Sequence, residues 1–218
     1  MMWPPSLLTN RSEETSTSAA IAAIAPKGVR VGCRIIRQGD EAQLLPEEDR
    51  SITSRHVAAR RASGAARWIA HRLLAELGVT DCAVLREASG APIWPGGVTG
   101  SLAHDERMAV AAVAPAAEID CLGIDVEPAT PLPDDIVALV ARDAEMSGMG
   151  NQPLSGRLLF SIKEAVYKAV YPIDRLILEY EDITVDLNAG QAVTKTNHAV
   201  RLAYCVTPRI VVLAYIPA

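Results

Sequence analysis

The feature that most constrains the fold is a short apolar run that closes on two carboxylates and a proline, Cys121-Leu-Gly-Ile-Asp125-Val-Glu127-Pro128. Its apolar, β-rich residues and its closing proline predict a buried strand over residues 121–127. Because side chains alternate between the two faces of a strand, Asp125 and Glu127 are expected to point the same way. Two carboxylates directed together repel each other unless a cation or a shared proton intervenes. Hard oxygen ligands of this kind suit Mg²⁺, although a strand end with solvent-facing acids is the commoner origin of the D-x-E spacing alone.

A second charged segment is predicted to be a helix. Residues 154–170 follow a helical pattern that Pro172 is expected to end. Glu164 and Lys168 lie four residues apart on one face, and Lys163 lies about 100° around the helix, from where it can approach the same substrate. Taken alone, this pattern is typical of a solvated face with an ion pair that contributes about 0.3–0.5 kcal/mol. Three carboxylates beside two lysines, however, favour a divalent cation with a polyphosphate, and so predict a magnesium-dependent enzyme acting on a phosphate ester.

These two segments and a third block upstream resemble motifs of the phosphopantetheinyl transferases, of the type of the surfactin-synthetase activators and enterobactin synthase component D. The family patterns are P-x-W-P-x-G-x-x-G-S-[IL]-[ST]-H, then G-[IV]-D-x-E, then [FW]-x-x-K-E-x-x-x-K. The matching runs are Pro92-Ile-Trp94-Pro95-Gly-Gly-Val-Thr-Gly100-Ser101-Leu-Ala-His104, Gly123-Ile-Asp125-Val-Glu127 and Phe160-Ser-Ile-Lys163-Glu164-Ala-Val-Tyr-Lys168. The resemblance keeps its order from about Pro26 to about Val185.

The resemblance implies a reaction and a set of site residues. The enzyme would transfer the 4′-phosphopantetheine arm of coenzyme A to a serine of an apo acyl or peptidyl carrier protein and release 3′,5′-ADP. Glu164 matches the proposed general base, acting directly or through water, while Lys168 can offset charge on the leaving group. His104 matches the histidine near the 3′-phosphate of coenzyme A. The implied metal ligands are Asp125, Glu127 and Glu164; the implied catalytic residues are Glu164 and Lys168; the implied coenzyme A-binding residues are Arg60, Arg67, Pro92, Ser101, His104, Asp125, Lys163 and Lys168.

An arginine-rich segment supplies two of these residues. Arg60 and Arg67 lie in a helical pattern over residues 54–77 and are two turns apart on one face. The family has arginines at about these places that contact phosphates of coenzyme A, and Arg67 has the matching spacing to the end of the helix. An arginine-rich helix in isolation is just as well explained as a solvated face.

The chain departs from the family pattern at several positions. Ala103 stands where Ser or Thr usually precedes the histidine, Ala66 replaces a glycine, and Ser89-Gly90-Ala91 lacks the basic residue that often precedes the proline. These losses bear on coenzyme A affinity and leave a non-catalytic relative that binds coenzyme A or a carrier as the alternative. An unrelated magnesium-dependent phosphohydrolase built on the same carboxylates is the third hypothesis.

The order of predicted elements indicates an α+β fold. Strands are expected near residues 29–37, 82–86, 98–103, 108–114, 121–127, 183–187, 201–206 and 210–216, and helices over residues 54–77, 134–140 and 154–170. The resemblance implies a pseudo-twofold pair of α+β halves with the site between them. We expect a mobile segment over residues 1–18, a first half over residues 19–117 that contributes to coenzyme A binding, and a second half over residues 118–218 that carries the magnesium and catalytic residues.

The composition of the chain restricts the kinds of partner that it can bind. The formal charge of −5 over 218 residues argues against nucleic acid as a generic partner. No segment has the length and apolarity of a membrane span or a leader peptide. Four cysteines without C-x-x-C spacing are expected to be reduced thiols, which points to the cytoplasm. The two-half arrangement leads us to expect a monomer.

Overall fold

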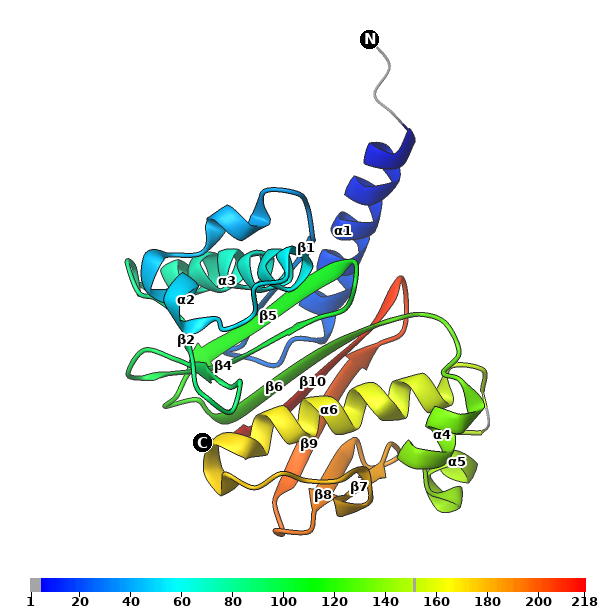
Figure 1. Ribbon diagram of the computed structural model, residues 1–218. Helices are drawn as coiled ribbons and strands as arrows, with labels where there is room; N and C mark the ends of the chain where they lie inside the picture. The colour runs from blue at the N-terminus through cyan, green and yellow to red at the C-terminus, as the bar shows by residue number, and fades with distance from the viewer. Residues whose placement is uncertain (1–4, 151) are drawn as a thin grey trace.

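The computed structural model describes residues 5–150 and 152–218 as two antiparallel sheets stacked between two long helices (Figure 1). The first sheet has the order β1-β5-β4, and the second has the order β6-β10-β9-β8-β7. Helix α3 (Val57–Glu76) covers the outer face of the first sheet, and α6 (Ser155–Asp174) covers the outer face of the second. The strands are β1 (Arg30–Ile35), β4 (Val98–His104), β5 (Met108–Pro115), β6 (Ile119–Pro128), β7 (Ile183–Asp186), β8 (Gln191–Thr194), β9 (Ala199–Cys205) and β10 (Arg209–Pro217). These elements confirm the α+β class.

The alternation of side chains along β6 decides where its carboxylates point. Leu122, Ile124 and Val126 enter the central core between the two sheets, so the intervening residues Gly123, Asp125 and Glu127 face α6. Strand β10 divides in the same way, with Val211 and Leu213 in the central core and Ile210, Val212 and Ala214 in the core under α6. The predicted common direction of Asp125 and Glu127 is therefore what the strand adopts.

Helix α6 rests on β6 by direct backbone contact. A Cβ atom added at Gly123 would lie 1.9 Å from the carbonyl oxygen of Ala165 and 2.8 Å from the amide nitrogen of Ala169. Only glycine leaves room for this approach. The closeness brings the side chains of α6 within hydrogen-bonding reach of the carboxylates of the strand.

Shorter elements complete the chain. Helices α4 (Asp134–Val140) and α5 (Asp143–Gly148) lie at one end of α6, and a short ladder joins β2 (Leu85–Arg86) to β3 (Pro92–Ile93). The remaining elements are α1 (Pro5–Ile24), η1 (Asp40–Gln43), α2 (Pro46–Ser51) and η2 (Tyr180–Asp182). No helix among the described residues is both long and apolar enough to cross a membrane.

Two predicted boundaries need correction. Residues 5–18, expected to be mobile, belong to α1, whose later part packs against β1 and β9 while its first turns project away from the sheets (Figure 1); residues 1–4 lie outside the described chain. Helix α6 continues past Pro172 to Asp174. Because Pro172 falls in the last turn, it removes only its own amide donor, and the amide of Arg175 closes the helix on the carbonyl of Tyr171.

The division into two halves stays a prediction. The boundary expected at residues 117 and 118 falls in the turn between β5 and β6, whereas the one expected at residues 18 and 19 falls inside α1.

Candidate active site

Asp125 of the strand motif accepts hydrogen bonds from two residues of the helix motif. Its Oδ1 accepts a hydrogen bond from Lys168 Nζ at 2.6 Å, and its Oδ2 accepts one from Ser161 Oγ at 2.9 Å. The Asp125 side chain is 8% exposed, whereas that of Lys168 is 28% exposed. A buried carboxylate is thus held by two residues of α6, and its cationic partner faces solvent.

Glu127 lies two residues further along the same face of β6. Its Oε2 accepts a hydrogen bond from Arg157 Nη1 at 2.8 Å. Burial raises the pKa of Glu127 above its ordinary value, and the nearby Asp125 raises it further, against the opposing pull of Arg157 and Lys168. The two carboxylates therefore repel each other electrostatically, as the sequence predicts.

Glu164 is held by a residue that the sequence interpretation did not single out. The hydroxyl of Tyr180 donates a hydrogen bond to Glu164 Oε1 at 3.1 Å, and the Tyr180 ring lies 5.9 Å from that of Phe160. Burial raises the pKa of Tyr180, and the charges of Glu164, Asp125 and Glu127 raise it further. The phenol consequently stays protonated as a donor, in a place where it senses all three carboxylates.

The carboxylates of the site suit a metal ion that also binds water and substrate better than one that only protein side chains coordinate. Within residues 5–150 and 152–218, no three His, Cys, Asp or Glu side chains gather closely enough to hold an ion by themselves. Magnesium commonly takes one or two carboxylates and completes its shell with water and substrate phosphates. Asp125 and Glu127 fit that role by their chemistry, since each is a hard oxygen donor now neutralised by a single basic side chain, Lys168 or Arg157.

Lys163 does not reach this site, contrary to the prediction that it contacts the pyrophosphate. Its side chain is buried and donates to the carbonyls of Val140 at 2.8 Å and Tyr180 at 3.0 Å, and to the Glu145 carboxylate at 2.9 Å. All three ammonium protons are therefore engaged inside the protein. Burial lowers the pKa of Lys163 and Glu145 opposes that shift. The residue joins α6 to α5 and to η2, and leaves no donor for a substrate.

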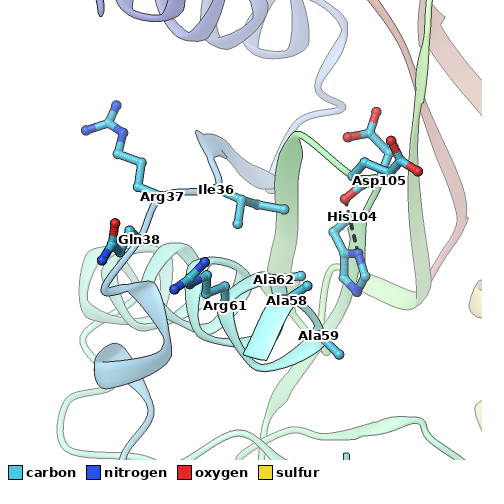
Figure 2. A pocket seen from close by; sticks show the side chains of 10 residues that line it. Ile36, Arg37, Gln38, Ala58, Ala59, Arg61, Ala62, His104 and Asp105 are labelled. Atoms are coloured by element: carbon cyan, nitrogen blue, oxygen red, sulfur yellow. Dashed lines mark hydrogen bonds between the residues drawn. The ribbon is translucent and has the colours of Figure 1, made fainter. Parts of the chain in front are cut away.

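A pocket of about 720 Å³ opens where β4 ends (Figure 2). It lies between the segment after β1, the first turns of α3, and the turn that follows β4. Its lining residues are Ile36, Arg37, Gln38, Ala58, Ala59, Arg61, Ala62, His104, Asp105 and Glu106. The pocket combines apolar alanines with basic side chains and with the carboxylates of Asp105 and Glu106, which suits a ligand that has both an apolar part and charged groups.

His104 links this pocket to the carboxylates. Partial desolvation of the imidazole lowers the pKa of His104, the positive charges of Lys168 and Arg86 lower it further, and Asp125 opposes them. Strand β4, which ends at His104, packs against the carboxylate strand β6. His104 of the pocket wall and Asp125 therefore lie on two strands that are in contact.

The arginines of α3 take other places than those predicted. Arg67 is 4% exposed, donates from Nε to the carbonyl of Val84 at 2.8 Å, and has that atom 4.0 Å from Glu48, so it serves the packing of α3. Arg60 forms an ion pair with Asp49 and does not line the pocket. Arg61, one residue further on, does line it and pairs with Glu41 at 2.9 Å.

The two remaining candidates belong to the scaffold around the pocket. Ser101 is buried on β4 opposite Ala112 of β5, and Pro92 pairs with Arg86 in the β2–β3 ladder. Neither lines the pocket. Their predicted contact with coenzyme A is not visible in this arrangement and stays a prediction.

Comparison with known proteins gives a consistent family. A model of the 4′-phosphopantetheinyl transferase N-terminal domain matches residues 47–114, and a model of the 4′-phosphopantetheinyl transferase superfamily matches residues 121–210. The chain is 34% identical over 177 residues to the 4′-phosphopantetheinyl transferase Npt of Nocardia iowensis, which covers 79% of each protein. It is 39% identical over 160 residues to the 4′-phosphopantetheinyl transferase Svp of Streptomyces mobaraensis, covering 69% of this chain and 65% of the relative.

A third relative agrees. The 4′-phosphopantetheinyl transferase PptT of Mycobacterium tuberculosis is 35% identical over 143 residues, which is 63% of each protein. The match therefore spans slightly less than two thirds of the Streptomyces and mycobacterial proteins, and more than two thirds of the Nocardia protein. With its two ordered family matches and its carboxylate strand lying under the lysine-bearing helix, the chain belongs to the 4′-phosphopantetheinyl transferase superfamily.

Proposed function

We propose that this chain is a magnesium-dependent enzyme that transfers the 4′-phosphopantetheine arm of coenzyme A to a serine of an apo carrier protein and releases 3′,5′-ADP. The observation that carries the proposal is the 2.6 Å contact between Lys168 and Asp125. This contact joins two sequence motifs beside a pocket whose wall includes His104, from the third motif. Charged groups from all three family motifs thus come together in one place.

The pocket is the proposed seat of the nucleotide end of coenzyme A. His104 lines it at the end of β4 and is proposed to approach the 3′-phosphate, with Arg61 on the opposite wall as a second positive charge. Arg61 takes the place that the sequence interpretation gave to Arg60 and Arg67. From this pocket, the pyrophosphate would extend toward Lys168, whose partly exposed ammonium would be available to a phosphate once it leaves Asp125.

Asp125, Glu127 and Glu164 are the proposed magnesium ligands. A bound magnesium ion would neutralise the pyrophosphate and polarise the attacked phosphorus. Asp125 and Glu127 present oxygens on the same side of β6, where Lys168 and Arg157 now bind them; these oxygens would hold the metal if the two basic side chains turned away. The same two basic side chains then become available to the substrate's negative charges.

Glu164 is proposed as the general base. It accepts the proton of the carrier serine, directly or through water, while the serine oxygen bonds to the β-phosphorus of coenzyme A. The bond from that phosphorus to the oxygen bridging the two phosphates breaks, and 3′,5′-ADP leaves with the electron pair. Tyr180 fixes one oxygen of Glu164 by its 3.1 Å hydrogen bond and leaves the other to face the serine. Lys168 offsets the charge that develops on the departing phosphate.

The residues of the site are divided between the two proposed halves. The pocket residues come from positions 36–106 and the carboxylate site from positions 125–180, in agreement with a first half over residues 19–117 and a second over residues 118–218. Since one chain supplies every proposed group, we infer a monomer. We further propose that it works in the cytoplasm. We propose a carrier of nonribosomal peptide or siderophore synthesis, with polyketide and fatty-acid carriers as the other members of the same substrate class.

The decisive experiment is to incubate the protein with Mg²⁺, coenzyme A and an apo carrier protein and to measure the intact mass of the carrier. A gain of one phosphopantetheine arm that disappears without Mg²⁺ and with Glu164→Gln is the expected result. No gain across several carriers, with coenzyme A still bound in calorimetry, would favour the non-catalytic relative. Release of phosphate from a phosphoester without any carrier would favour a phosphohydrolase.

A further inference from the structure

Helix α1 contacts the turn that directly follows His104, although α1 lies outside the residues that either family model matches. The Glu13 carboxylate of α1 accepts a hydrogen bond from Arg107 Nε at 2.8 Å and one from Arg209 Nη1 at 3.1 Å. Arg107 belongs to the turn between β4 and β5, and Arg209 begins β10. One carboxylate of the N-terminal helix thus connects the two sheets.

The turn itself is built around Asp105, which directly follows His104. Asp105 Oδ1 accepts the backbone amides of Arg107 and Met108, each at 2.8 Å, which fixes the path of the chain. The other oxygen of Asp105 forms an ion pair with Arg209. His104 and Asp105 lie side by side at this end of the pocket (Figure 2). The position of His104 therefore depends on the guanidinium that holds its neighbour.

Arg209 belongs to the strand that lies next to the carboxylate strand. In the β10–β6 ladder, Arg209 stands opposite Pro128, and the following Ile210 stands opposite Glu127. The Arg209 side chain is 7% exposed and has a carboxylate on each side, Glu13 and Asp105. Its two anionic partners already engage the charge of this buried cation inside the protein. Arg209 thereby connects β10, the neighbour of β6, to the turn that follows His104.

The network is made of opposite charges. Two arginines, Arg107 and Arg209, pair with the carboxylates of Glu13 and Asp105. Burial raises the pKa of Glu13, but the hydrogen bonds from the two arginines outweigh burial and lower it below its ordinary value. The carboxylate therefore stays charged, and the network persists through the neutral pH range.

We propose that Glu13 and Arg209 are positioning residues that hold His104 at a fixed distance from the carboxylate strand, so that coenzyme A fits both the pocket and the catalytic carboxylates. This inference rests on the proposed function, because it takes the pocket as the seat of the 3′-phosphate. It assigns a role in substrate binding to α1, which lines neither the pocket nor the carboxylate site itself but contacts the lining residue Arg37 through Glu14. Binding should weaken when the network is cut, while the chemical step remains.

The test uses the full chain with Glu13→Ala and measures the dissociation constant of coenzyme A by calorimetry. We expect an increase of about fivefold for coenzyme A and a much smaller increase for 3′-dephospho-coenzyme A. In a His104→Ala background, Glu13→Ala should add little further loss, because both changes act on one contact. Glu76→Ala is the matched control, since its carboxylate is exposed at the far end of α3 and, within the described part of the chain, pairs with Arg30 alone, at 3.9 Å.

Each result decides the inference separately from the proposed function. Equal losses for coenzyme A and its dephospho form, or full additivity with His104→Ala, would overturn the positioning role. Unchanged binding by Glu13→Ala would do the same. Glu13→Gln keeps an acceptor for Arg209 and should restore most of the affinity, which a general loss of folding would not allow. If the unaltered chain binds coenzyme A but modifies no carrier, the proposed transfer fails while this comparison of affinities still stands.

Discussion

Replacing Lys163 by methionine separates a structural lysine from a substrate-binding one. The Lys163→Met side chain retains most of the length of lysine but cannot donate to Glu145, Val140 or Tyr180, the three partners of the buried ammonium. Removing one partner of a buried ion pair destabilises a protein by about 3–5 kcal/mol. Glu145 keeps its bonds to the backbone amides of Arg142 at 3.0 Å and Val185 at 2.9 Å, so we expect the lower end of that range.

The loss can be measured as a change in the free energy of unfolding. About 3 kcal/mol corresponds to a fall in Tm of about 6–12 °C for a chain of this size. Urea unfolding followed by circular dichroism gives the free energy directly. Carrier modification at a temperature where the variant is folded should show a KM for coenzyme A within about twofold of the unaltered enzyme, because the ammonium does not face the pocket.

Lys168→Met is the matched control, and it should behave in the opposite way. Its ammonium is partly exposed and pairs with Asp125, which keeps the Ser161 hydrogen bond when the lysine is lost. We expect a change in stability of about 1 kcal/mol and a large loss of transfer. If Lys163→Met were as stable as the unaltered chain and raised the KM for coenzyme A tenfold, the structural assignment of Lys163 would be refuted.

The remaining predictions concern three other groups. Tyr180→Phe should lower kcat about tenfold with little change in KM, because one hydrogen bond to the Glu164 carboxylate is lost; steady-state kinetics with unaltered kcat would contradict this. Asp125→Ala should abolish transfer or raise the magnesium requirement, and a magnesium titration that matches the unaltered enzyme would exclude Asp125 as a ligand. Burial tends to raise the pKa of Glu48, but hydrogen bonds from His71 and two backbone amides outweigh it and lower that pKa below 4.5. Glu48 therefore stabilises the fold above pH 4.5, and this contribution is lost as the pH falls through the lowered value; urea unfolding of Glu48→Gln should show a weaker acid dependence.

Prediction from the sequence succeeded best where the local pattern alone determines which way a side chain points. Strand alternation is a property of the backbone, so the common direction of Asp125 and Glu127 could be predicted without a partner. The order of three motifs likewise predicted the family, and their association follows from the α6–β6 contact. The strand and helix ranges near the site differ from the structure by a few residues, because helix ends depend on capping contacts that lie elsewhere in the chain.

The misassigned residues are those whose burial depends on distant partners. Lys163 meets Glu145 and Tyr180, and Arg67 meets Val84, contacts that no local pattern reveals. A signal was nevertheless present, since Lys163 follows Leu159 by four residues and so lies on the buried side of its helix. A charged residue inside an apolar stripe is a candidate for a buried ion pair before it is a candidate for a ligand.

The N-terminal helix shows a second limit of prediction from the sequence, because composition alone did not indicate that this segment is helical. Residues rich in Ser, Thr and Glu suggested a mobile segment, yet Glu13 and Glu14 bind Arg107, Arg209 and Arg37. The arginines that receive them lie far along the chain. A polar segment becomes ordered when its charges find such partners, and this depends on the tertiary fold.

Gly123, which lies under α6, has a consequence for how this chain can vary in evolution. A methyl group at Gly123 would force the helix away from β6, and Lys168 would withdraw from Asp125. A residue without a side chain therefore sets the distance between the carboxylate strand and the lysine-bearing helix, because a Cβ here would meet backbone atoms rather than a flexible side chain. New carrier or coenzyme preferences are expected to arise from changes in the pocket walls and loops, where the main chain has room to adapt. The contact between β6 and α6 at Gly123 is expected to stay unchanged.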